Sequence, residues 1–312
     1  MSSSFLKSIG LYLFLIIFPF KNVYAACGLS LSANDINITW TSTWTIQSVS
    51  LIATKTNPAA CTFGLSFSKG VAGNYTRYGQ NGAAKLYYQF YQDSGGTKIL
   101  KDIPDTLTTN DVVMVTMPPG GGPQIVQFYI DIPYALATTP TLAAAGVYTD
   151  NIVISAFEGT DPSAFVAPAE TTASFNLNMT IEKQINLSFV DLGGFFQENT
   201  VTKSVDFGRL SANQVSRFNM AVRTNAGFNI TIVSTNNGRF KHNIQTSYVP
   251  YDVYVNNTVV DVTGVIPVAT GSGQTTLAGL IYPVKIVVGA VGTLAIAGSY
   301  SDTLTVTAIV TD

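Results

Sequence analysis

Short runs of alternating hydrophobic and polar residues fill most of the chain after residue 28. The clearest run extends from Thr171 to Ile181, where Phe175, Leu177 and Met179 alternate with polar side chains. Because successive side chains of a strand point to opposite faces, this segment predicts a strand with one apolar face. It lies between two halves of similar pattern, so the half that receives the apolar face decides how the protein is organised.

The other runs are rich in Val, Ile, Thr, Tyr and Phe and are separated by clusters of Gly, Pro, Asn and Asp. Almost nothing is helical, and this pattern is typical of β-sandwiches and barrels, so we predict an all-β fold. In the first half the expected strands are Leu29–Thr39, Thr45–Thr54, Thr62–Ser68, Lys85–Gln92, Asp111–Met117, Gln124–Tyr134 and Tyr148–Phe157. In the second half they are Gln184–Val190, Arg217–Arg223, Phe228–Val233, Tyr251–Val255, Ile281–Val288 and Asp302–Val310.

Two local similarities indicate an internal duplication. Residues 145–154 match residues 297–306, and their glycines Gly146 and Gly298 are 152 positions apart (298 − 146 = 152). The stretch Tyr-Gln-Phe-Tyr at 88–91 resembles Tyr-Asp-Val-Tyr at 251–254, at an offset of 163 (251 − 88 = 163). We expect two domains, 26–181 with 171–181 as its last strand, and 182–312.

The N-terminus has the pattern of a secretory signal peptide at residues 1–25. Lys7 precedes an apolar run, Leu11–Phe18, and Val23-Tyr24-Ala25 fits the small-residue cleavage site. A membrane anchor is one alternative, but the run is shorter than the roughly 20 residues that cross a bilayer. A lipid-anchored Cys27 is the second, disfavoured because Tyr24 stands where such signals have a Leu-like residue. We expect no membrane span in the mature chain.

The composition describes a folded, secreted protein without catalytic or nucleic-acid chemistry. The 312 residues are 46% hydrophobic and 11% charged, and 16 basic against 18 acidic residues leave no basic surface for nucleic acid. Cys27 and Cys61 are the only cysteines and predict one disulfide in an oxidising compartment. Two cysteines and one histidine offer too few ligands for a metal. His242 is expected on the surface, with no triad partner nearby, so we expect neither an enzyme nor a cofactor.

The duplicated motifs carry a family resemblance. Gly-x-Tyr-x-Asp and Tyr-x-x-Tyr both occur twice, and Asp206-Phe207-Gly208 matches another signature of the same family. On these motifs the chain resembles the spore coat protein U-like family, over essentially the whole mature chain. Members include subunits of archaic, Csu-type chaperone–usher pili, and the two-domain arrangement resembles their tip adhesin. The resemblance implies two immunoglobulin-like β-sandwich domains in tandem, the C-terminal one lacking its last strand.

The two ends of the sequence lead us to expect a pilus tip rather than a shaft subunit. A shaft pilin of this family carries an alternating donor extension before its first cysteine, whereas Cys27 follows the predicted cleavage site at once. At the other end the sequence stops soon after the strand that carries Leu304, Val306, Ala308 and Val310. These residues are expected to edge an open acceptor groove. The alternative is a finished domain whose terminal strand lies at a harmless edge.

An open groove implies partners in succession. These would be a periplasmic pilus chaperone, the outer-membrane usher and an adjacent pilin subunit that donates a strand, which places the chain at the surface of a Gram-negative bacterium. In the first domain, Phe175, Leu177, Met179 and Ile181 correspond to a donor strand, and we expect them to complete that domain from within the chain. The alternative is that they begin the second domain.

Sandwich connectivity then directs three loops away from the second domain. The expected surface-binding residues in them are Pro58, Ala59, Met117, Pro118, Pro119, Pro123, Phe165, Val166 and Pro168. Apolar side chains on stiff exposed loops indicate a binding surface. The resemblance to the archaic tip adhesins implies adhesion to an abiotic or host surface and a role in biofilm formation. Three alternatives remain: Met117 and Phe165 fold back onto the domain, the protein is a structural coat or matrix protein of the same family, or Trp40 and Trp44 serve a carbohydrate-binding module.

Overall fold

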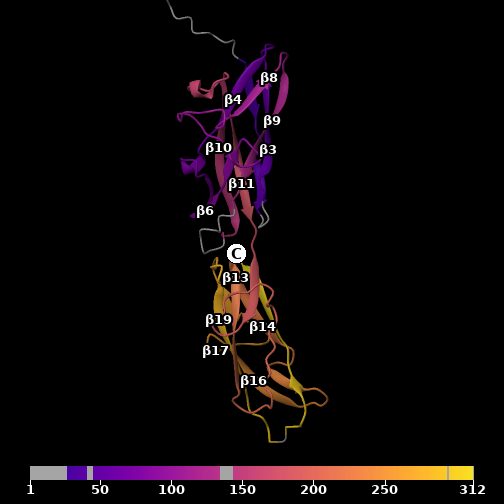
Figure 1. Ribbon diagram of the computed structural model, residues 1–312. Helices are drawn as coiled ribbons and strands as arrows, with labels where there is room; N and C mark the ends of the chain where they lie inside the picture. Colours follow the sequence, from indigo (N-terminus) through magenta and orange to yellow (C-terminus); the bar gives the residue numbers. More distant parts are fainter. Residues whose placement is uncertain (1–26, 41–44, 134–142, 294, 312) are drawn as a thin grey trace, which may run out of the picture.

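Nearly all regular structure in the chain is β-strand. The computed structural model describes residues 27–40, 45–133, 143–293 and 295–311, so the predicted signal peptide and Trp44 lie outside the described residues. Two β-rich domains follow one another along the long axis of the molecule, and each has an apolar core of its own (Figure 1). The prediction of an all-β chain with two tandem domains is confirmed. In the described part of the chain, no helix is long and apolar enough to cross a membrane.

The first domain is a sandwich of two sheets. One sheet has the strand order β1 (Leu29–Ser32), β3 (Gln47–Lys55), β9 (Gly122–Asp131) and β7 (Gln89–Tyr91). The other has the order β2 (Ile36–Trp40), β11 (Thr171–Ile181), β10 (Gly146–Glu158), β4 (Cys61–Phe67) and β8 (Val113–Met117), with the hairpin β5 (Tyr78–Asn81) and β6 (Ala84–Tyr87) attached to β10. Two single turns of 3-10 helix, η1 (Gly70–Ala72) and η3 (Pro162–Ala164), lie in its loops.

The second domain repeats this plan with fewer strands. Its larger sheet has the order β12 (Ile185–Val190), β13 (Val215–Thr224), β19 (Leu280–Val288), β16 (Tyr248–Val255), β15 (Arg239–His242) and β20 (Tyr300–Ser301), with β17 (Thr258–Val259) beside β16. The smaller sheet has the order β18 (Ala269–Gly271), β14 (Gly227–Ser234) and β21 (Leu304–Thr311).

Strand β11 belongs to the first domain. It pairs antiparallel with β10 over eleven residue pairs and parallel with β2 on its other side. Its apolar face is fully covered, because Phe175, Leu177, Met179 and Ile181 are all buried in the first core. The strand then leads directly into the linker to the second domain (Figure 1).

Aromatic packing explains why this face needs the first core. The ring of Phe175 lies 5.9 Å from that of Phe90 and 6.4 Å from that of Phe128, centroid to centroid. Phe67 completes the group, 4.8 Å from Phe128. Tilted and edge-on rings at these separations contribute beyond the area that they bury.

The strand boundaries depart from the sequence prediction in two places. The expected single strand Leu29–Thr39 is two strands, because β1 pairs with β3 in one sheet and β2 pairs with β11 in the other. The chain changes sheets at residues 33–35. The expected strand Lys85–Gln92 is likewise divided into β6 and β7. Several strands of two to four residues escaped prediction because segments this short have no readable period, namely β5, β15, β17, β18 and β20.

Asn225 joins the two domains. Its backbone carbonyl accepts a hydrogen bond from the N–H of Ala145 in the first domain at 2.9 Å. Its side chain accepts from the N–H of Gln184 at 2.7 Å and donates to the carbonyl of Glu182 at 2.8 Å. The linker after β11 is therefore tied to a buried residue of the second domain.

Replacing Leu177 by Asp should unfold the first domain, since a carboxylate would enter a core where Leu177 has no exposed surface. We expect a loss of about 4 kcal/mol or more in the free energy of unfolding. Thermal unfolding followed by near-ultraviolet circular dichroism measures this loss. Thr172→Asp, on the exposed face of the same strand, is the matched control and should change stability little. Equal midpoints for the two variants would contradict this assignment of β11.

Candidate functional site

Three loops gather at the distal pole, which is the end of the first domain away from the second. They are residues 56–60 between β3 and β4, residues 118–121 between β8 and β9, and residues 159–170 between β10 and β11 (Figure 1). The first two loops are joined, because the N–H of Gly120 donates to the carbonyl of Pro58 at 2.7 Å. The buried ammonium of Lys55 also donates to the carbonyl of Ala59, which holds the first loop in place.

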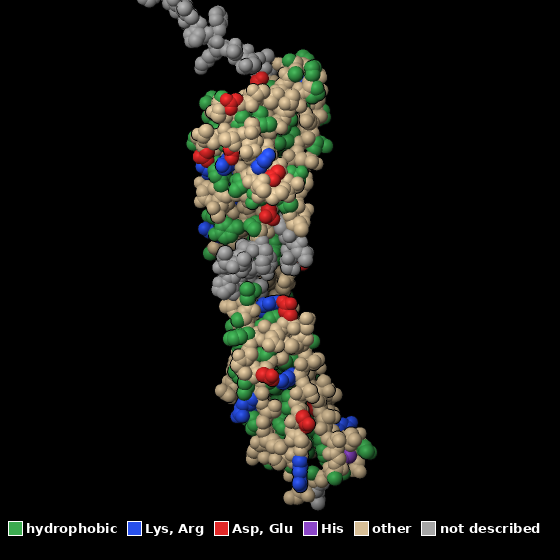
Figure 2. Space-filling view, in the orientation of Figure 1, with side chains coloured by type: hydrophobic (Ala, Val, Ile, Leu, Met, Phe, Trp, Pro, Cys, Tyr) green, Lys and Arg blue, Asp and Glu red, His purple; other side chains and the backbone are tan. Residues whose placement is uncertain are grey.

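Exposed apolar side chains occupy this pole. Figure 2 shows hydrophobic groups gathered at the end of the first domain, among few charges. The side chain of Val166 is 74% exposed, and Ile125 and Ile52, paired across β9 and β3, are 68% and 44% exposed. We call the following residues the distal apolar surface: Ile52, Pro58, Ala59, Pro118, Pro119, Pro123, Ile125, Val166 and Pro168. Sequence reasoning missed Ile52 and Ile125, which break the inward-apolar alternation of their strands.

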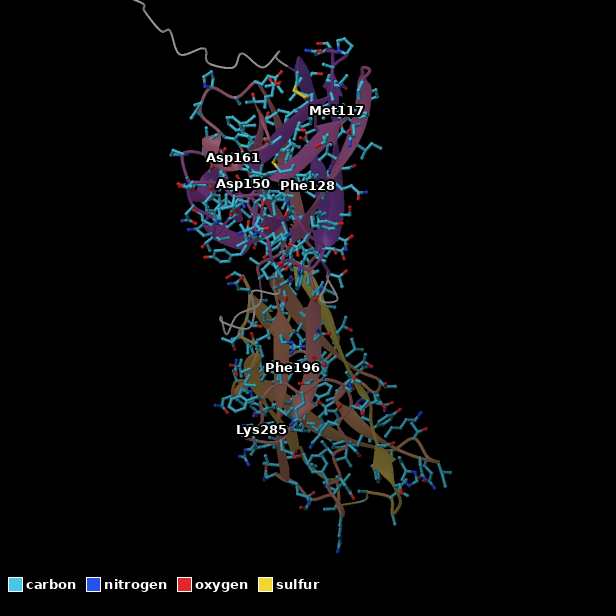
Figure 3. The ribbon with its side chains drawn as sticks, turned by 45° about the horizontal axis from the view of Figure 1, so that its top comes forward. Met117, Phe128, Asp150, Asp161, Phe196 and Lys285 are labelled. Carbon is cyan, nitrogen blue, oxygen red and sulfur yellow. A yellow bond between two sulfur atoms is a disulfide. The ribbon has the colours of Figure 1, made fainter. Side chains whose placement is uncertain are left out.

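Two residues expected in this surface are buried, so their prediction as contact residues is wrong. Phe165 stacks on Phe157 with ring centroids 5.3 Å apart and packs in a small cluster with Leu107 and Val112. Gly64 leaves room for that ring, since a Cβ there would lie 2.5 Å from it. Met117 is the last residue of β8 and lies opposite Cys61, beside the disulfide (Figure 3).

The disulfide between Cys27 and Cys61 joins the start of the chain's described part to β4. Two carboxylates lie next to it: Glu158 accepts from the N–H of Cys27 at 3.2 Å, and Glu170 accepts from the N–H of Leu29 at 3.0 Å. Burial and the neighbouring Glu170 raise the pKa of Glu158. Cys27, Glu158 and Glu170 are the one group of possible metal ligands among the described residues, with their ligand atoms within 4.8 Å of one another. The sulfur of Cys27 is bonded to Cys61 and is therefore not available to a metal ion. The two carboxylates bind the backbone N–H groups of Cys27 and of Leu29, the first residue of β1, and so hold the start of this strand.

The second domain has an open groove where β21 forms the edge of its sheet. β21 pairs with β14 on one side, and no strand of the described ranges pairs with its other side. The predicted edge residues Leu304, Val306, Ala308 and Val310 are only half-buried. The counterparts of the first three on β10, Ile152, Ile154 and Ala156, are fully buried. A groove of about 1310 Å³ lies beside Leu304 and Val306, and residues 201–210 also line it. Apolar side chains form its floor, including Phe218, Met220, Ile232, Val253, Val284 and Ile286.

A tyrosine–aspartate hydrogen bond is repeated at equivalent positions in the two domains. The hydroxyl of Tyr88 donates to Asp150, and that of Tyr251 donates to Asp302, both at 2.5 Å. Burial and the adjacent carboxylate raise the pKa of each tyrosine, so both stay protonated donors. Each aspartate therefore has a hydrogen-bond donor from a buried tyrosine. Asp150 lies inside the first domain (Figure 3).

A second tyrosine contact is repeated as well. The hydroxyl of Tyr148 donates to the carbonyl of Ala144 at 2.8 Å, and that of Tyr300 donates to the carbonyl of Ile296 at 2.9 Å. In both domains the acceptor lies four residues before the tyrosine. The Gly-x-Tyr-x-Asp motif thus makes the same tyrosine hydrogen bond at the start of β10 and in β20, the short strand that precedes β21.

The sequence led us to expect His242 on the surface, and this prediction is wrong because the residue is buried. Its Nδ1 accepts from the N–H groups of Ile244 and Gln245, and its Nε2 contacts the carbonyl of Ala297 at 3.2 Å. Its ring meets Tyr300 edge-on at 5.0 Å. The residue orders the loop that leads into β20.

Comparison with known proteins identifies the family. The chain matches the Spore Coat Protein U domain twice, over residues 20–155 and 170–307, and it belongs to that family. No curated protein sequence matches it.

Solved structures show only distant likeness. One is the CsuC–CsuE complex of a chaperone and a tip adhesion subunit from archaic chaperone–usher Csu pili of Acinetobacter baumannii, at 15% identity and a TM-score of 0.44, over 90% of this chain and 99% of that one. Another is the CupB6 tip adhesin from Pseudomonas aeruginosa, at 11% identity and a TM-score of 0.38, over 90% of this chain and 94% of that one. Similarity at this level assigns no function.

Phe165→Ala should lower the free energy of unfolding by about 3 kcal/mol, because it empties a buried ring site. Val166→Ala, at the neighbouring exposed position, should stay within about 0.5 kcal/mol of the original chain. Denaturant unfolding of both variants measures the difference. A larger loss for Val166→Ala would show that the loop 159–170 presents the ring outward instead.

Proposed function

We propose that this protein is the tip adhesin subunit of a chaperone–usher pilus. The first domain grips a surface with its distal loops, and the second domain joins the pilus by accepting a strand from the adjacent pilin subunit. The groove beside β21 is the observation that carries the proposal. It lies where the first domain has β11, and its floor is apolar core rather than polar surface.

An open groove of this kind requires partners. A strand with an unpaired edge over an exposed core is a template for aggregation unless another chain covers it. Strand addition supplies both the missing backbone hydrogen bonds and the missing apolar side chains. A periplasmic chaperone would cover the groove first, and the donor strand of the next pilin would replace it at the outer-membrane usher. These steps place the protein at the surface of a Gram-negative cell.

The distal apolar surface supports attachment at the opposite end. Burying apolar area releases about 25 cal/mol per Å², and this force needs no particular ligand. The prolines at 58, 118, 119 and 123 stiffen the loops, so contact costs little conformational entropy. Such a surface suits abiotic or host materials and attachment of cells in a biofilm.

Expression of the chain alone in the periplasm should give mainly aggregated protein, whereas co-expression with its pilus chaperone should give a soluble complex. The reason is the uncovered groove in the second domain. Soluble yield and size-exclusion chromatography measure this directly. A structural coat or matrix protein with two finished domains would fold alone, so a soluble, monomeric, cooperatively unfolding chain would contradict the pilus assignment.

Ile125→Asp combined with Val166→Asp should reduce retention on polystyrene by about ten-fold or more. Each side chain contributes roughly 1.5–3 kcal/mol when fully covered, and 1.4 kcal/mol is a factor of ten. Retention of the chaperone-bound protein under washing measures the effect.

Val147→Asp is the matched control, because Val147 is also apolar and 49% exposed but lies at the start of β10, near the second domain. It should leave retention unchanged. Equal retention of the double variant and the control would remove the distal apolar surface from the proposal and leave the groove unaffected.

A further inference from the structure

The ring of His242 joins two segments of the second domain. Its Nδ1 accepts from the N–H groups of Ile244 and Gln245 at 3.1 and 3.0 Å, in the loop between β15 and β16. Its Nε2 lies 3.2 Å from the carbonyl oxygen of Ala297, shortly before β20. The side chain is only 4% exposed, so these backbone groups rather than water satisfy its two nitrogens.

These contacts define the protonation state of the ring. A nitrogen that accepts two N–H bonds carries no hydrogen, and a carbonyl oxygen can only accept. The network therefore assigns the neutral tautomer, in which Nε2 donates to Ala297 and Nδ1 is bare. A second proton would go on Nδ1, where it would point at the N–H groups of Ile244 and Gln245 and break both hydrogen bonds.

The segments packed against the ring offer no charge that would balance a proton. Residues 243–247 and 295–301 include no charged side chain. Tyr300 meets the ring edge-on at 5.0 Å, and its hydroxyl is bonded to the carbonyl of Ile296 and to Ser247.

Charged residues close to these segments in the sequence are engaged elsewhere. Arg239 and Lys241 on β15 are exposed, whereas His242 is buried. Asp302, which follows β20, accepts from the hydroxyl of Tyr251. A buried imidazolium without a carboxylate partner is costly, so a protonated ring is favoured only outside this position.

The first domain makes the equivalent contact with an asparagine. Asn81, the last residue of β5, donates to the carbonyl of Ala145 at 3.4 Å. Ala145 and Ala297 are 152 positions apart, which is the offset of the internal repeat (297 − 145 = 152). β5 pairs with β10 as β15 pairs with β20. Asn81 therefore stands where the second domain has His242.

A glycine allows the close approach in both domains. A Cβ on Gly146 would lie 2.1 Å from the amide nitrogen of Asn81, and one on Gly298 would lie 2.1 Å from Nε2 of His242. The two hairpins differ in length, because two residues join β5 to β6 and five join β15 to β16. The longer loop has N–H groups that need an acceptor, and Nδ1 supplies it.

We propose that His242 is a pH-sensitive switch in the second domain. The neutral ring holds residues 295–301 against the loop 243–247, and protonation releases both segments. Residues 295–301 line the groove, so acid would loosen one of its walls. The first domain, with Asn81 at this place, keeps its contact at both pH values.

The direction of the effect follows from the acceptor role of Nδ1. An unperturbed imidazole gains its proton near pH 6.5. The two hydrogen bonds to Nδ1 are therefore present above this range and are lost as the pH falls through it. This inference goes beyond the proposed function and does not depend on it, because it concerns the order of the second domain alone.

Hydrogen–deuterium exchange of the full chain, read by mass spectrometry, tests the switch. Exchange at about pH 7.5 is compared with exchange at about pH 5.5, on either side of the imidazole range, with labelling times scaled for the intrinsic pH dependence of amide exchange. Peptides that cover 243–247 and 295–301 should lose protection several-fold at the lower pH. Peptides that cover 78–87 and 144–150 are the internal reference and should keep theirs.

The loop 243–247 is the decisive reporter. None of its residues lines the groove, so it reports on the switch whether the soluble chain is free or bound to a chaperone. An equal response of the two sets of peptides to pH would overturn the proposal.

His242→Asn is the matched variant. An asparagine oxygen accepts from N–H groups two and three residues further on and does not titrate. This variant should keep the loop protected at both pH values, whereas His242→Ala should leave it exposed at both. A pH dependence that persists in His242→Asn would assign it to another group and overturn the proposal.

The original chain provides a second measurement that needs no variant. His242 is its only histidine, so the imidazole resonances in an NMR titration belong to this residue. Their titration should coincide with the loss of protection in the loop 243–247. A ring that takes up its proton while the loop stays protected would contradict the switch.

Discussion

The edge of a β-sheet must be paired or covered, and this requirement organises the whole molecule. In the first domain β11 meets it with hydrogen bonds to two neighbours and with four buried side chains. In the second domain the equivalent edge, β21, stays open beside an apolar groove. The first domain is therefore closed at this edge, and in the proposed function a strand from another chain would cover the open edge of the second domain.

The two domains share a tyrosine–aspartate hydrogen bond beside this edge, although only the first domain has a strand paired with it. Tyr88–Asp150 and Tyr251–Asp302 place the same buried hydrogen bond beside the same strand in both domains. Asp302 also accepts hydrogen bonds from the hydroxyl of Ser234 and the N–H of Asn236. A polar pair organised in advance lowers the cost of covering it. The duplicated motif thus supplies the same tyrosine–aspartate hydrogen bond in both domains.

The alternation of apolar and polar residues and the internal repeat predicted the fold from the sequence. The contacts of individual loop residues could not be predicted in this way. The alternation from Thr171 to Ile181 is long enough to specify a strand and its inward face. Phe165 gives no such signal: its burial depends on the absence of a side chain at Gly64, about a hundred positions away. Arg77 is a similar case, fully buried with its guanidinium donating to the carbonyls of Phe67 and Leu100. Such contacts follow from tertiary packing, which one sequence does not display.

The course of β11 has a mechanical consequence. The strand begins at the distal pole and ends in the linker that Asn225 holds, so tension between the pole and the second domain acts along its length. Its hydrogen bonds to β10 and β2 lie across that direction and are loaded in shear, all together rather than one after another. The path of force and the strand that closes the first domain are the same segment. In the proposed tip adhesin, a pull on the bound surface would therefore strain the first domain along the strand that closes it.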